Sequence, residues 1–206
     1  YKNVTITDTL STYVDFAEAT PTITVTKRNA AGTITLAADT DYTLNCSGKM
    51  VSVRLLNGYS LEDGATYTVS FRVKPSDAAN AYYKEHQSYP NKGDAGTGTT
   101  SADKDGFYSN DNDQTKISYE IDGTSDGIKT ASYIKPVVQV TTHTLTYTKV
   151  WNHPSSIEKP TQNVELNVTY SDGTTEKITL TNKEKYTYQE TVPVTKYIVS
   201  VTENAV

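Results

Sequence analysis

The feature that most constrains the fold is a strict two-residue alternation of side-chain types, clearest at residues 145–151. Successive side chains of an extended strand point to opposite faces. One face of this segment therefore carries Leu145, Tyr147, Lys149 and Trp151, and the other is rich in threonine. Threonine and tyrosine favour strands. The segment predicts a β-strand whose apolar face includes a lysine.

Lys149 needs a partner, because burying an ammonium ion costs several kcal/mol unless it is paired or neutral. The end of the chain offers an acid in a similar setting. Tyr197, Val199, Val201 and Glu203 alternate with residues of the other face. We therefore expect Lys149 and Glu203 to lie inside one domain, where a buried salt bridge is the simplest alternative to a chemical role.

The segments around these two residues resemble the collagen-adhesin B-type (CnaB) domains of Gram-positive surface proteins and pilins. The similar stretches are Tyr147-Thr-Lys-Val-Trp151, Tyr186-Thr-Tyr188 and Tyr197-Ile-Val-Ser-Val-Thr-Glu203. In that family a lysine of the first strand condenses with an Asn or Asp of the last strand into an isopeptide bond. The resemblance implies that Lys149 is the nucleophile and Glu203 the catalytic acid. Asn204 follows Glu203 directly and faces the other way, so we expect the last strand of this domain to be missing.

Composition and charge exclude several classes of protein. The chain has 16 tyrosines but only 35% hydrophobic residues, which favours strands with hydroxylated outer faces. A net charge of -5, without long runs of one sign, provides no basic patch for binding nucleic acid or an anionic membrane. The single Cys46 excludes an intrachain disulfide. We expect no cofactor, no nucleic-acid partner and no membrane partner.

Residues 2–10 repeat the alternation and again place an ionisable group among aliphatic ones. Lys2, Val4, Ile6, Asp8 and Leu10 share one face. Strand-like segments follow up to residue 142, interrupted by two other features. Ser76 is a good N-cap for a short helix at 77–86. Residues 89–106 are rich in Gly, Thr, Ser and Asp and predict a mobile surface loop.

The chain is expected to be all-β, with two immunoglobulin-like β-sandwich domains in tandem and one short helix in the first. The boundary lies near Thr142, so the domains are 1–142 and 143–206. Residues 143–206 contain short strands separated by evenly spaced turns, which is typical of such sandwiches.

The first domain resembles the A-type (CnaA-like) adhesin domain of the same superfamily, through Val4-Thr-Ile-Thr-Asp8 and Phe107-Tyr-Ser-Asn110. There, an early Asp assists a Lys–Asn isopeptide bond. The resemblance implies that Asp8 is the acid and that Asn110, or Asn112 by a one-step shift, is the crosslinked amide. The family's lysine lies on an upstream strand. Lys2 is the candidate in this sequence, and an upstream strand is expected to be missing, as it would be after an inserted von Willebrand A-type head.

An acidic tract offers a weak candidate for calcium, with Asp103, Asp105, Asp111 and Asp113 as oxygen ligands. It lacks the spacing and the bidentate Glu of an EF-hand. A solvated loop is the favoured interpretation.

These features predict a structural stalk of a cell-wall-anchored Gram-positive surface adhesin or pilin, located outside the cell. The crosslink forms once per molecule, so the protein is not an enzyme. Its partners are other domains of the same surface protein or pilus subunits. The alternative is a binding module that recognises host matrix protein or glycan through the loop at Tyr82–Asp113.

Overall fold

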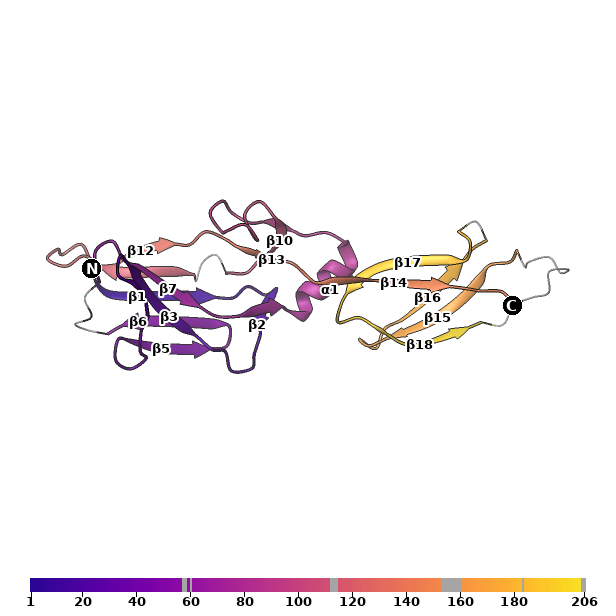
Figure 1. The fold of residues 1–206 in the computed structure, drawn as a ribbon, viewed down its shortest axis with the longest axis horizontal. Coiled ribbons are helices and arrows are strands. Elements are labelled where there is room, and N and C mark those ends of the chain that lie inside the picture. The colour runs from indigo at the N-terminus through magenta and orange to yellow at the C-terminus, as the bar shows by residue number, and fades with distance from the viewer. Residues whose placement is uncertain (57–58, 60, 112–114, 153–160, 183, 205–206) are drawn as a thin grey trace. The chain divides into compact units, whose positions relative to one another are not determined.

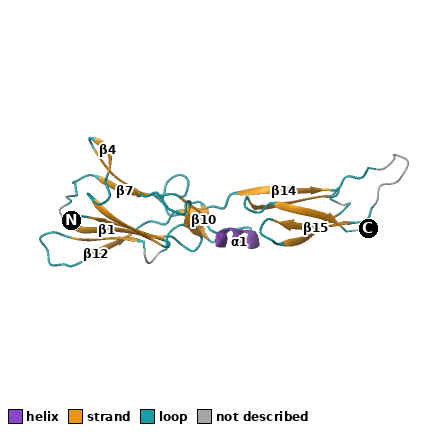
Figure 2. Cartoon of the chain, turned by 90° about the horizontal axis from the view of Figure 1, so that it is seen from below, coloured by secondary structure: helices purple, strands orange, loops and turns teal. Residues whose placement is uncertain are grey.

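The computed structural model describes residues 1–56, 59, 61–111, 115–152, 161–182 and 184–204. The chain divides into two compact units, Tyr1–Val140 and Thr141–Val206 (Figure 1). Strands dominate both units, and the described residues contain a single helix (Figure 2). The all-β fold class is therefore confirmed. The division falls two residues before the expected boundary.

Unit 1 is built on a five-stranded and a three-stranded antiparallel sheet that share a core. The larger sheet has the order β12-β11-β1-β6-β5, and the smaller has the order β4-β3-β7. The strands of the larger sheet are β1 (Lys2–Thr9), β5 (Tyr42–Ser47), β6 (Met50–Leu55), β11 (Lys116–Glu120) and β12 (Lys129–Ser132). Those of the smaller are β3 (Thr24–Asn29), β4 (Gly32–Thr35) and β7 (Thr66–Ser70). Val25 of the smaller sheet packs with Val51 and Val53 of the larger one in this core.

A second group of elements in unit 1 surrounds the short helix. Strand β2 (Val14–Phe16) pairs with β8 (Val73–Pro75), and β10 (Asp105–Tyr108) pairs with both β9 (Asn91–Lys92) and β13 (Val137–Val138). Helix α1 (Asp77–His86) begins as predicted, because the Ser76 hydroxyl accepts a hydrogen bond from the amide of Ala79 over 3.3 Å.

The expectation of an irregular loop at 89–106 is wrong in part. Asn91–Lys92 form β9, and Gly93 forms an isolated β-bridge with Ala102. A Cβ on Gly93 would lie 2.0 Å from the Ser101 carbonyl oxygen. Glycine is therefore what allows the two arms of this loop to come together.

The alternation in β1 holds over most of the strand. Val4 and Leu10 are buried on the face that also carries Ile6 and Asp8. The pairing register with β11 shifts between Lys2 and Thr5, and Asn3 has a φ of 53°. A bulge of this kind changes the direction of the side chains before it. The alternation therefore cannot be extended to Lys2, which is exposed.

Unit 2 is a smaller sandwich. Strand β14 (Thr142–Thr148) pairs with β17 (Thr187–Pro193), and β15 (Val164–Tyr170) lies between β16 (Thr175–Leu180) and β18 (Ile198–Glu203). The core contains Tyr147 from the first sheet and Val164, Val168, Tyr170 and Leu180 from the second. The alternation predicted for β14, and a similar one in β15, therefore builds this core.

Candidate functional site

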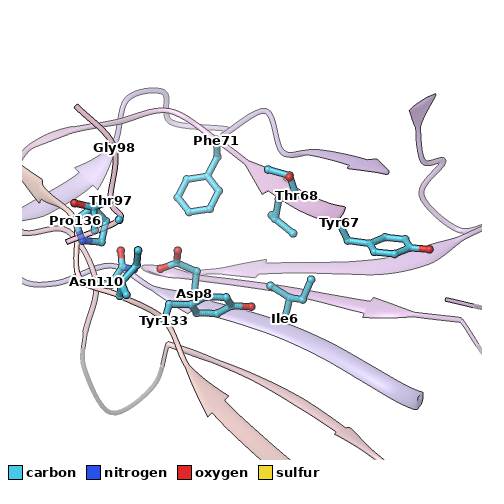
Figure 3. Close-up of a pocket in the computed structure, with 13 residues that line it drawn as sticks. Ile6, Asp8, Tyr67, Thr68, Phe71, Thr97, Gly98, Asn110, Tyr133 and Pro136 are labelled. Carbon is cyan, nitrogen blue, oxygen red and sulfur yellow. The ribbon is translucent and has the colours of Figure 1, made fainter. Parts of the chain in front are cut away.

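Asp8 points from β1 into a pocket of about 530 Å³ in unit 1 (Figure 3). Burial raises the pKa of its carboxyl group to about 6, against a smaller opposing effect of a hydrogen bond from Thr115. That bond is long, with 3.5 Å between Thr115 Oγ1 and Asp8 Oδ1. The same hydroxyl lies 3.2 Å from the Thr9 carbonyl oxygen. Asp8 therefore keeps its proton to a higher pH than an ordinary aspartate does.

Asn110 lines the same pocket, although 102 positions in the sequence separate it from Asp8. A β-bridge joins Asn110 to Leu10, just beyond the end of β1. The next amide, that of Asp111, donates to the Thr9 carbonyl over 2.7 Å. Figure 3 shows Asp8 and Asn110 pointing into the pocket below Phe71. The structure thus brings together the acid and the amide that the resemblance to A-type domains singled out.

One wall of this pocket is the edge of a sheet. Strand β7 ends the order β4-β3-β7, and among the described residues no strand pairs with its other edge. Residues of β7 line the pocket, the loop around Gly96–Gly98 and the segment Tyr133–Pro136 complete its wall, and Ile6 and Asp8 form its floor (Figure 3). An unpaired edge is a template for another strand. The pocket is therefore open to an extended segment lying along β7, which we call the β7 slot.

Lys2 does not belong to this site. Its ammonium group lies 3.2 Å from Asp122, both side chains are largely exposed, and Lys2 does not line the pocket. Six residues of strand separate it from Asp8, or about 20 Å. The expectation that Lys2 supplies the amine does not fit this geometry, because the bulge at Asn3 ends the alternation. Asn112 and Asp113 lie outside the described residues.

Lys149 and Glu203 meet in unit 2, as the alternation predicted. The Lys149 ammonium lies 2.9 Å and 2.7 Å from the two carboxylate oxygens of Glu203. It also lies 4.7 Å from the centroid of the Trp151 ring. Lys149 directly follows β14, where its amide donates to the Tyr186 carbonyl. The first and last strands of the unit are thus joined by a bidentate ion pair.

This pair is less buried than expected, since the side chains are 24% and 37% exposed. Glu203 lies opposite Leu166, and Val201 lies opposite the buried Val168, so β18 does present both residues toward the core. Val201 is nevertheless 45% exposed. The reason is that β18 is an edge strand, and the facing sheet contains only β14 and β17 within the described residues. We call this partly exposed region between β14 and β18 the β14 slot.

Asn204 is held on the other side of β18. Its side chain accepts a hydrogen bond from Asn167 and donates to Glu165 over 3.2 Å. It is therefore engaged away from Lys149, in agreement with its exclusion as a crosslink partner.

Unit 2 also contains buried polar groups that the sequence did not single out. Glu190 Oε1 accepts hydrogen bonds of 2.7 Å from both Tyr147 and Tyr170. Burial raises the pKa of both tyrosines, so they remain protonated donors. Lys196 is buried over the Tyr170 ring and lies 2.8 Å from Glu176. The alternation Tyr188-Gln-Glu190-Thr-Val192 would have indicated Glu190, whereas Lys196 precedes β18 and carries no such signal.

Unit 1 also holds a trio of acid, amine and amide in a different environment. Glu62 accepts from Lys27 over 2.9 Å and from Asn29 over 2.5 Å. Hydrogen bonding to Lys27 lowers the pKa of Glu62, and the same bond raises the pKa of Lys27. Both groups therefore remain charged, which leaves no neutral amine for chemistry. This trio, in which the acid and the amine stay charged, contrasts with Asp8 and Asn110.

The loop considered as a ligand platform packs most of its aromatic side chains on one another. Tyr82, Tyr83 and Tyr89 pack around the buried Phe107 in a small core that includes Ala79. These rings stabilise the helix region and do not form an open aromatic surface.

The acidic tract forms no cluster in the part of the chain that is described. No group of three or more His, Cys, Asp or Glu side chains there could hold a metal ion. Within the same residues, no helix is both long enough and apolar enough to cross a membrane.

Residues 1–139 match the model of a protein family described as "Domain of unknown function (DUF7604)". The chain belongs to this family. The DUF7604 match ends one residue before the boundary of unit 1. No curated protein matches the chain.

Among solved structures, the chain is similar to the pilus adhesin SpaC from Lactobacillus rhamnosus GG. The open conformation matches with a TM-score of 0.60 and 16% identity, over 100% of this chain and 22% of SpaC. A second crystal form gives a TM-score of 0.55 and 18% identity, over 98% of this chain and 22% of SpaC. This DUF7604 chain thus has the fold of a part of a Gram-positive pilus adhesin and spans about a fifth of that protein.

Proposed function

We propose that the chain is a stalk segment of an extracellular, cell-wall-anchored surface adhesin or pilin, stapled by intramolecular isopeptide bonds. One observation carries the proposal. Within the described residues, unit 1 has a pocket beside the unpaired edge of β7 and unit 2 has a partly exposed region beside the unpaired edge of β14, and each holds an acid with one of the two groups that an amide crosslink needs. The β7 slot supplies Asp8 and the carboxamide of Asn110. The β14 slot supplies Glu203 and the amine of Lys149.

Each slot requires a further strand that carries the missing reacting group. A strand lying along β7 has to bring a lysine to Asp8 and Asn110, with apolar neighbours two positions away to cover Ile6 and Phe71. A strand beside β14 has to bring an Asn or Asp to Lys149. Such strands would exclude water from the reacting groups. Burial of this kind favours the neutral amine and the protonated acid that condensation requires.

The reaction is a single event in each molecule and not an enzymatic turnover. Proximity replaces a bimolecular encounter, which is worth several kcal/mol of the barrier. A bond that closes a loop of about 100 residues stabilises the fold by about 5 kcal/mol in the chain-entropy model. It also prevents separation of the joined strands under load, which suits a stalk that holds a binding head away from the cell wall. The proposed partners are therefore neighbouring domains of the same protein or pilus subunits.

The sharpest test is peptide mapping of the protein expressed from its complete reading frame. Each Lys–Asn bond releases ammonia and lowers the intact mass by about 17 Da. Trypsin does not cleave after an acylated lysine, so cleavage between Lys149 and Val150 should disappear. The tryptic peptide 105–116, which contains Asn110, should be found joined to a lysine-containing peptide. A linear 105–116 peptide, together with normal cleavage after Lys149, would refute the stapled stalk.

The trio of Lys27, Asn29 and Glu62 is the matched control in the same digest. These residues have the required chemical groups but keep their charges. Cleavage after Lys27 should therefore be normal. Crosslinking there would mean that the charge state of the acid and the amine does not select the reacting site.

A further inference from the structure

Ser109 lies next to Asn110 and is already bonded to its carboxamide. Its hydroxyl donates to Asn110 Oδ1 over 2.7 Å, and a second acceptor, the Pro136 carbonyl, is 3.3 Å away. Ser109 is 7% exposed. Its own amide donates to Pro136 and its carbonyl accepts from Ser11, each over 2.9 Å. The hydroxyl is therefore fixed against the oxygen of the amide before any lysine arrives.

We propose that Ser109 is a catalytic residue of the crosslinking reaction at Asn110, where it donates a hydrogen bond to the oxyanion that forms on Oδ1. The inference rests on the proposed function, because it assigns a role within that reaction. Fixed donors aimed at developing charge are among the largest contributions to acyl-transfer catalysis.

The step balances with the groups present and an incoming lysine. The lone pair of the neutral amine attacks Asn110 Cγ, and the carbonyl π electrons move to Oδ1, where the Ser109 hydroxyl stabilises the negative charge. Asp8 then gives its proton to Nδ2, and the carbonyl re-forms as the C–N bond breaks and ammonia leaves. The former amine passes one proton to Asp8, which restores the acid. One amine and one carboxamide thus give one isopeptide bond and one ammonia.

A second donor is needed because Asp8 has only one proton to give. The proton transferred to Nδ2 is not available to neutralise Oδ1 at the same moment. The nearby Thr115 hydroxyl contacts the backbone of Thr9. It accepts a hydrogen bond from the Thr9 amide over 3.0 Å and lies 3.2 Å from the Thr9 carbonyl oxygen. Ser109 is the group that contacts Oδ1. Asp8 and Ser109 therefore divide proton transfer and charge stabilisation between them.

The test measures how fast Asn110 becomes crosslinked. The complete reading frame is translated in a cell-free system, samples are quenched with acid, and loss of the linear tryptic peptide that contains Asn110 is followed by mass spectrometry. Loss of one oxyanion donor costs about 100-fold or more in rate. We expect Ser109→Ala to slow the reaction by about 100-fold and Ser109→Thr, which keeps the hydroxyl, to react near the wild-type rate. Asn110→Ala should not react.

Two further variants separate chemistry from folding. Ser109→Cys keeps the side-chain size but has only a weak donor, so it should fold normally and react slowly. Neither Asn110→Ala nor the Ser109→Ala, Asn110→Ala double variant can crosslink, so their melting temperatures compare stability alone.

Crosslinking of Ser109→Ala and Ser109→Cys within about twofold of the wild-type rate overturns the role of Ser109 but leaves the stalk proposal intact. A slow Ser109→Thr variant overturns it too. Failure of the wild type to crosslink Asn110 instead refutes the proposed function at this site.

Discussion

At the scale of single residues, the environment of an acid matters more than the groups beside it. Glu62 has both an amine and an amide within hydrogen-bonding distance, yet its pKa is lowered. Asp8 has weaker contacts, and burial raises its pKa to about 6. The sequence alone does not distinguish the environments of these two acids. Only the packing around each acid distinguishes a salt bridge from a reactive site.

The raised pKa of Asp8 predicts a pH dependence of stability in the 206-residue chain. The folded state holds this proton more tightly than the unfolded state, so the free energy of unfolding falls as pH rises from about 4 to 7. Asp8→Asn removes this loss and should be about 1–2 kcal/mol more stable than the wild type near pH 7. This gain in stability is smaller than the full pKa shift of Asp8 implies, because the pocket is partly open to solvent. Near pH 4 the two proteins should have the same free energy of unfolding.

Urea unfolding at several pH values checks this prediction, and Glu62→Gln provides a control of opposite sign. The lowered pKa of Glu62 gives stability that is present at neutral pH and lost as pH falls. Its substitution should therefore remove stability at pH 7. Parallel pH profiles for Asp8→Asn and the wild type would contradict the buried state of Asp8.

Lys49 fixes the segment that follows β1. Its ammonium donates to the carbonyls of Ser11, Thr12 and Val14 over 2.8–3.2 Å and lies 2.9 Å from the Asp15 carboxylate. Lys49→Met leaves these acceptors to water and should destabilise unit 1 by about 1–2 kcal/mol in urea unfolding.

Lys104→Met is the matched control for Lys49→Met. Lys104 is exposed, and no hydrogen bond or ion pair of its ammonium is seen in the described part of the chain. Its substitution should leave stability within about 0.5 kcal/mol of the wild type. Equal effects of the two variants would show that the contacts of Lys49 contribute nothing.

At the scale of elements, Lys196 and Glu176 join the segment before β18 to β16 with unequal burial. The Lys196 side chain is 4% exposed and that of Glu176 is 40% exposed. Removing the acid leaves a buried, unpaired charge, whereas removing the lysine leaves a carboxylate that water can reach. Glu176→Ala should therefore cost about 2–3 kcal/mol, and Lys196→Met about 1 kcal/mol. Urea unfolding measures both, and the reverse order would contradict the burial seen here.

Alternation predicted the face that residues occupy except where the pairing register shifts, at Lys2 and near Ile198, and it did not predict what covers that face. It correctly placed Glu203 and Val201 with the core residues Leu166 and Val168. Their exposure depends on the width of the opposite sheet, which no local pattern encodes. The same limit explains β9, where two residues join a ladder because Gly93 permits a close approach to Ser101.

At the scale of the whole molecule, the pairing of Asp8 with Asn110 could not be derived from periodicity. It depends on a β-bridge between residues 100 positions apart, Leu10 and Asn110, and thus on the topology of unit 1. The resemblance to A-type domains supplied it. Ser109 was missed because a single serine beside an asparagine carries no signal, and only its hydrogen bond to Oδ1 reveals a role.

The crosslinks should dominate the thermal stability of the complete protein. A bond worth about 4–5 kcal/mol raises the melting temperature of a domain the size of unit 1 by about 10–15 °C, and that of the smaller unit 2 by about twice as much. Asn110→Ala should therefore lower the transition of unit 1 by about 10 °C and restore about 17 Da of mass. Lys149→Ala should lower the transition of the smaller unit 2 by about 20 °C, with about 18 Da restored if its partner is an aspartate, because water is then the leaving group.

Asn112→Ala decides which asparagine is the reacting one. The substitution leaves Asp8, Ser109 and Asn110 unchanged, so the crosslink and the melting temperature should be retained. A loss of both on Asn112→Ala, with Asn110→Ala unaffected, would move the crosslink two residues along the chain. It would also remove Ser109 from the reaction, because its hydroxyl contacts the amide of Asn110.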